Sequence, residues 1–86
     1  MDLYRRMGKE LRSLFVDLFD PQSKKVVREK IAQIVATATQ IGGSIEKEAK
    51  KFSEDVVQFL ENPKDPKRLA VMKDHALRLE YETREL

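Results

Sequence analysis

The stretch from Ile31 to Ile45 contains no charged residue, although Asp, Glu, Lys and Arg make up 37% of the chain. A helix on the surface of a soluble protein normally carries charge on its outward face within two turns. We therefore expect this stretch to contact protein on more than one side, either as a buried central helix or as a surface for self-association.

The length of the chain, 86 residues, predicts one small domain. A domain of this size buries only about 60–65% of the surface of its unfolded chain, which leaves its stability marginal. Dimerisation would increase the buried apolar surface. Leu, Ile, Val and Phe account for 24 of the 86 residues, a share above the range expected for intrinsic disorder, so the chain should fold.

The chain has 17 basic and 15 acidic residues, so its charges are mixed and its net charge is only +2. This balance requires neither a nucleic acid nor a membrane as partner. The absence of cysteine excludes disulfides and thiolate nucleophiles. No apolar run reaches the ~18–20 residues of a membrane span, and the start of the chain lacks the apolar core of a signal peptide. We expect a soluble, cytoplasmic protein.

Apolar residues recur at alternating steps of three and four along the chain, which is typical of amphipathic helices. The pattern predicts an all-α protein with helices at about 2–19, 21–41, 44–61 and 66–85 in a single domain, 1–86. The four apolar stripes are Leu3, Met7, Leu11, Leu14 and Leu18; Val27, Ile31, Ile34, Ala38 and Ile41; Ile45, Ala49, Phe52, Val56 and Phe59; and Leu69, Met72, Ala76 and Leu79.

Asp20-Pro21 and Asp65-Pro66 each combine a capping carboxylate with a proline at the first helical position, where the missing amide hydrogen costs nothing. Each pair predicts a helix start. Gly42-Gly43 provides a helix stop, and Ser44 a possible cap for the third helix.

The glycine pair leaves one alternative open. The stripes on its two sides share one angular phase, as they would on an unbroken helix. A break at the glycines gives an antiparallel four-helix bundle, which we favour. A kink gives one long central helix with two flanking helices, and that arrangement would require dimerisation.

The face of the second helix opposite its core stripe carries small residues at steps of four, three and four. Such a ridge allows another helix to approach closely, so we predict a helix-packing or dimer interface at Ala32, Ala36, Thr39 and Gly43. Gln33 and Gln40 are candidates for hydrogen bonds across it.

Basic residues gather on the first helix and at the start of the second, away from the apolar stripes: Arg5, Lys9, Arg12, Lys24, Lys25 and Arg28. Such a group can bind anions, and nucleic acid is one possible partner. A nucleic-acid reader would add exposed stacking aromatics, whereas Tyr4 and Phe15 lie on or beside the apolar stripe.

His75 is the single histidine and lies beside the apolar stripe of the fourth helix. We interpret it as a boundary residue hydrogen-bonded to a carboxylate. One histidine leaves the serines without a nucleophile-activating arrangement and excludes a dimetal carboxylate site. We predict no catalytic residue, no bound metal and no cofactor.

These patterns predict a small helical interaction protein that self-associates or docks on a helical partner. The alternative is a helical nucleic-acid-binding protein that uses the basic face of the first two helices. A third class is a catalytic bundle whose active site assembles around His75 across a dimer.

Overall fold

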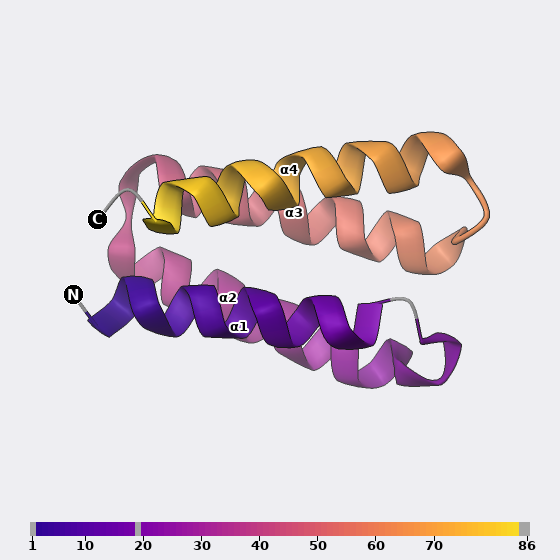
Figure 1. Ribbon diagram of the computed structural model, residues 1–86, viewed down its shortest axis with the longest axis horizontal. Coiled ribbons are helices and arrows are strands. Elements are labelled where there is room, and N and C mark those ends of the chain that lie inside the picture. The colour runs from indigo at the N-terminus through magenta and orange to yellow at the C-terminus, as the bar shows by residue number, and fades with distance from the viewer. Residues whose placement is uncertain (1, 19, 85–86) are drawn as a thin grey trace.

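The periodic stripes and the turn residues between them produce an antiparallel four-helix bundle, as predicted (Figure 1). The computed structural model describes residues 2–18 and 20–84. Within them the chain forms α1 (Asp2–Leu18), a short 3-10 helix η1 (Pro21–Ser23), α2 (Lys24–Ile41), α3 (Gly43–Glu61) and α4 (Pro66–Arg84), and no strand. The Cα trace measures 36 × 22 × 17 Å along its principal axes.

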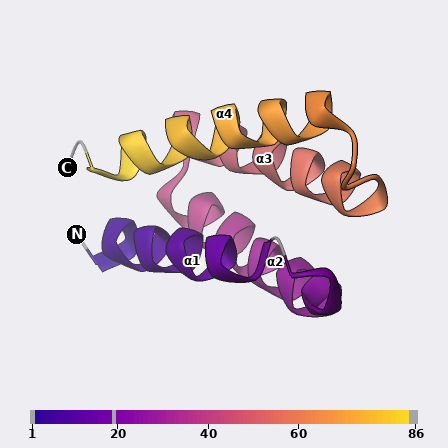
Figure 2. The same cartoon turned by 45° about the vertical axis from the view of Figure 1, so that its right-hand side comes forward.

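The bundle consists of two helical hairpins, α1–α2 and α3–α4, which pack side by side (Figure 1, Figure 2). The link between α2 and α3 lies at the same end as both chain termini, and the other two connections lie at the opposite end. Each helix packs on the next in the chain, and α1 closes the bundle against α4. That closing seam is less extensive than the others.

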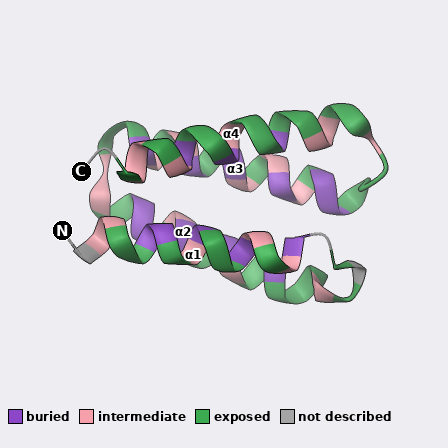
Figure 3. Cartoon of the chain, viewed as in Figure 1, coloured by how far each residue is buried: buried purple, intermediate pink, exposed green. Residues whose placement is uncertain are grey.

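The core is made by the predicted stripes apart from Leu3, which is only partly buried. Figure 3 marks the buried residues along all four helices. Met7, Leu11, Leu14, Ile34 and Phe52 are among the fully buried side chains. Each buried leucine, isoleucine or phenylalanine contributes roughly 1.5–3 kcal/mol of transfer free energy. Leu69 and Ile41 lie at the edge of the core, only partly buried. Three of the described buried residues lie outside the predicted stripes: Gly8, Thr37 and Leu60.

Two aspartates start helical segments as the sequence predicts. The Asp20 carboxylate accepts hydrogen bonds from the Gln22 amide and the Ser23 hydroxyl, both at 3.0 Å. Because the Ser23 amide also bonds the Asp20 carbonyl three residues back, this first turn is 3-10, and the α-helix begins at Lys24 rather than at 21. Asp65 accepts from the Lys67 amide at 2.9 Å.

Gly42 and Gly43 form a turn rather than a kink. Their φ angles are +80° and +64°, and no other described residue has positive φ. Two consecutive residues of this kind cannot continue a right-handed helix, so α2 ends at Ile41 and the long-central-helix alternative is excluded. Gly42 caps both helices, and α3 begins at Gly43. The predicted Ser44 cap is therefore wrong, and the Ser44 hydroxyl instead donates to Glu82 of α4 at 3.5 Å.

The predicted helix ends at 19 and 85 lie outside the described residues. Position 44, the predicted start of the third helix, is one residue late. The remaining predicted boundaries agree with the structure except at the 3-10 turn.

Polar contacts fix the register of α1 against α2. The buried Thr37 hydroxyl donates to the Glu10 carboxylate at 2.7 Å, and Lys30 pairs with Asp17. The Lys30 ammonium also donates to the Ser13 carbonyl at 3.3 Å. Since each contact joins residues 13 or more positions apart, the set holds the outward face of α2 in one orientation relative to α1.

Alanine substitutions at two glycines should change stability in opposite directions. Gly42→Ala should lower the free energy of unfolding by about 1–3 kcal/mol, because φ of +80° with ψ of −171° is nearly restricted to glycine. Gly8→Ala should raise it by up to about 1 kcal/mol, because alanine is the better helix former. A Cβ at Gly8 would meet its nearest atom at 3.6 Å, an ordinary contact.

Denaturant unfolding followed by circular dichroism measures both changes. A Gly42→Ala variant as stable as the parent would mean that the chain does not reverse at this residue.

Candidate functional site

The outward face of α2 is the surface that the sequence singled out. Its core side is occupied by Ile31, Ile34 and Ala38, which are buried, and its other side faces solvent. The exposed residues between Ile31 and Ile45 are Ala32, Gln33, Ala36, Thr39, Gln40, Gly43 and Ser44. The chain's own helices therefore cover one side of the uncharged stretch and leave the other open.

The small residues Ala32, Ala36 and Thr39, called the α2 ridge below, are exposed on α2. Gly43, the fourth predicted interface residue, is also exposed, but it is the first residue of α3, beyond the turn that ends α2, so it does not continue the ridge. The Thr39 hydroxyl donates to the Val35 carbonyl at 2.8 Å, so its proton is already used within the helix. With a rise of 1.5 Å per residue, the ridge from Ala32 to Thr39 is about 10 Å long. It is a smooth, weakly hydrated strip without charge.

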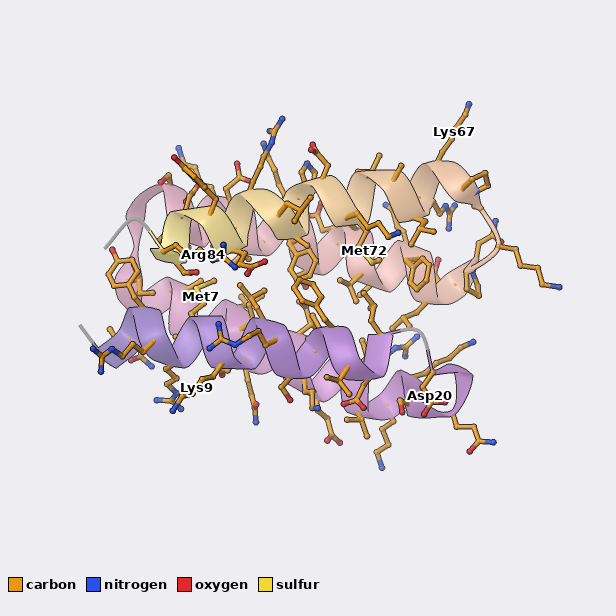
Figure 4. The ribbon with its side chains drawn as sticks, viewed as in Figure 1. Met7, Lys9, Asp20, Lys67, Met72 and Arg84 are labelled. Atoms are coloured by element: carbon orange, nitrogen blue, oxygen red, sulfur yellow. The ribbon has the colours of Figure 1, made fainter. Side chains whose placement is uncertain are left out.

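Three of the predicted anion-binding residues, Arg5, Lys9 and Arg12, lie around one cavity between α1 and α4. The cavity has a volume of about 340 Å³. Tyr4 and Gly8 complete the α1 wall, and the α4 wall is formed by Thr83 and Arg84. Figure 4 shows Lys9 on α1 and Arg84 on α4, near the end of the bundle that carries both termini.

The other three predicted anion-binding residues, Lys24, Lys25 and Arg28, are exposed on the first turns of α2. They follow the Asp20 turn, which lies at the opposite end of the bundle from Lys9 and Arg84 (Figure 4). The structure therefore separates the six basic residues into two groups instead of gathering them at one site.

His75 hydrogen-bonds through Nδ1 to the Asp55 carboxylate of α3. Both side chains are mostly buried, with 22% and 16% of their surface exposed. The predicted role of a boundary histidine bound to a carboxylate is thus confirmed, with its partner on the neighbouring helix. The contact joins α3 to α4, so a structural role accounts for His75.

The described residues show neither a metal-binding cluster nor a membrane-spanning helix. Among the side chains that the structure describes, no three of His, Asp or Glu are grouped so as to hold a metal ion. Across the same residues, no helix combines the length and apolarity needed to cross a membrane.

Comparison of the chain with protein families, curated proteins and solved structures found no match.

Sequence reasoning missed the α4 wall of the cavity, Thr83 and Arg84. Arg84 is a basic residue in the last turn of its helix, a position that is common for reasons of helix stability alone. Its place beside Arg5 and Arg12 follows only from the packing of the first helix on the last. Asp55 was missed as the partner of His75 for the same reason.

Removing His75 should destabilise the bundle more than removing an exposed arginine from the same helix. His75→Ala should lower the free energy of unfolding by about 1–2 kcal/mol, because it leaves the mostly buried Asp55 carboxylate without this partner. Arg78→Ala removes an ion pair with Asp74 whose side chains are both more than 60% exposed, and should cost less than about 0.5 kcal/mol.

Urea unfolding of the two variants gives the comparison. Equal stability losses in the two variants would show that the contact between α3 and α4 does not contribute as described.

Proposed function

We propose that this protein is a small helical interaction protein whose α2 ridge binds a second copy of the chain. The observation that supports this function is the exposure of the ridge: Ala32, Ala36 and Thr39 all face solvent on a helix segment with no charge. In a chain that is 37% charged, an outward helix face without charge is unusual. The proposal keeps the cytoplasmic setting expected from the sequence.

A second copy is the partner favoured by symmetry. In a two-fold dimer the same patch is used by both subunits, so residues near the axis face their own equivalents. A charged side chain there would meet a like charge, whereas Ala36 meets another small apolar residue. With Ala36 at the axis of an antiparallel pair, Ala32 of one copy lies beside Gln40 of the other.

The size of the ridge indicates how strong this association should be. Small side chains allow helix axes to approach to the lower part of the usual 8–10 Å range. A strip about 10 Å long and one helix wide buries less area than the ~1,200–2,000 Å² buried in stable protein complexes. We therefore expect a weak dimer, with dissociation in the micromolar range or above.

The nucleic-acid alternative has less support. The six basic residues lie in two groups toward opposite ends of the bundle, and the aromatic residue that joins the first group, Tyr4, is half-buried and packs against the core. A continuous contact with a phosphate backbone would need cations along the whole path between the groups.

A charge placed on the ridge should abolish self-association without unfolding the protein. In Ala36→Glu dimers, two carboxylates would face each other near the axis, so this variant should remain monomeric at concentrations where the parent dimerises. Ala70→Glu, an equal change at an exposed alanine of α4, should dimerise like the parent. Sedimentation equilibrium over a range of about 10–500 μM spans the expected affinity.

Thermal melts followed by circular dichroism establish that both variants are folded. A parent that stays monomeric at the highest concentration would refute self-association, and dimerisation of Ala36→Glu equal to that of the parent would show that the contact lies elsewhere.

A further inference from the structure

We infer that the cavity between α1 and α4 binds a small phosphate monoester. Its wall combines four cationic side chains, Arg5, Lys9, Arg12 and Arg84, with the half-buried ring of Tyr4. No carboxylate of the described residues lines it. This inference concerns a different face from the α2 ridge and does not depend on dimerisation.

The three cations of α1 lie on one side of the helix because of their spacing. Arg5, Lys9 and Arg12 stand at steps of four and three, which places them on one side of the helix. Among the side chains that the structure describes, which do not include that of Asp2, no carboxylate forms an ion pair with any of the three. Their charges repel one another in the free protein, and a bound dianion would relieve that repulsion.

The fourth cation comes from the other side of the seam. Arg84 donates to Glu80 at 2.6 Å through one guanidinium nitrogen, and its side chain is 74% exposed. A guanidinium has five N–H donors, so this bond leaves others for an anion. Two arginines from α1 and one from α4 can thus approach a phosphate from two sides, with the forked geometry that suits phosphate oxygens.

Gly8 allows the Arg12 guanidinium and the Thr83 side chain to lie close to the α1 backbone. A Cβ built on Gly8 would lie 3.6 Å from Nη1 of Arg12 and 4.0 Å from Oγ1 of Thr83, so both groups lie over this glycine. The Thr83 hydroxyl donates to the Glu80 carbonyl at 2.6 Å and has no second proton for an anion. The donors for the phosphate are therefore the guanidinium and ammonium groups.

The volume of the cavity favours a small ligand over a polymer such as nucleic acid. At about 340 Å³, the cavity lies near the lower end of the ~300–1,000 Å³ typical of small-molecule sites. That volume suits one phosphate group with a compact apolar body against Tyr4. Nucleic acid would also need the second basic group, which lies toward the opposite end of the bundle.

The probe for this site is phenyl phosphate, titrated into 15N-labelled protein at low ionic strength and followed by amide chemical shifts. We expect saturable shifts at Tyr4, Gly8, Arg12 and Thr83. Inorganic phosphate should shift the same amides with lower affinity, because it lacks a body to contact Tyr4. Phenol, which lacks the anion, should shift none of them.

Matched variants separate this site from general charge attraction. Arg5→Gln/Arg12→Gln should weaken phenyl phosphate binding by at least about tenfold, since two charge-assisted hydrogen bonds are lost. Arg6→Gln/Lys24→Gln makes the same change in net charge at two exposed cations outside the cavity, and should change affinity by less than about twofold. Equal weakening in the two double variants would overturn the inference.

Occupying the cavity without altering its charge provides the second test. Gly8→Leu should abolish the shifts at Tyr4 and Thr83 while all four cations remain. If this variant does not fold, Gly8→Ala, whose added Cβ makes only ordinary contacts, should still weaken binding. Unchanged binding in a folded Gly8 variant would overturn the inference, as would tighter binding of a single-stranded oligonucleotide that also shifts the amides of Lys24, Lys25 and Arg28.

Discussion

The reversal of the chain at Gly42 and Gly43 is the constraint on which the other contacts depend. Left-handed φ at two successive residues ends α2 and sends α3 back along it, so one continuous apolar stripe becomes two facing halves of a core. With an unbroken helix, α1 and α4 would lie on separate halves of a long rod. The seam between them, and the cavity within it, exist because the chain turns here.

The same turn decides which side of the uncharged stretch is available to a partner. Packing of α2 against both α1 and α3 uses its apolar side and leaves Ala32 and Ala36 in solvent. The Thr37–Glu10 and Lys30–Asp17 contacts then prevent α2 from rotating about its axis without losing hydrogen bonds. The same contacts that set the register of α2 against α1 therefore also keep the α2 ridge facing solvent.

Local patterns predicted most of the fold and only part of the candidate sites. The stripe from Leu11 to Leu18 and the Asp20 cap depend on residues a few positions apart, so they could be read directly from the sequence. Whether Gly42 is a turn or a kink could not be decided, because both conformations preserve the same stripe phase. The cavity between α1 and α4 was beyond reach for a different reason: Arg12 and Thr83 lie 71 positions apart, and no sequence period relates them.

The seam has a consequence for the cohesion of the whole chain. Three of the four helix contacts join consecutive helices, whereas the contact of α1 with α4 joins the first helix to the last. A molecule held there by Arg12 and Arg84 would act as a non-covalent ring closure, because neither hairpin could separate from the other without releasing it. Binding of a ligand would then slow amide hydrogen exchange along all four helices, and not only along α1 and α4, which line the cavity.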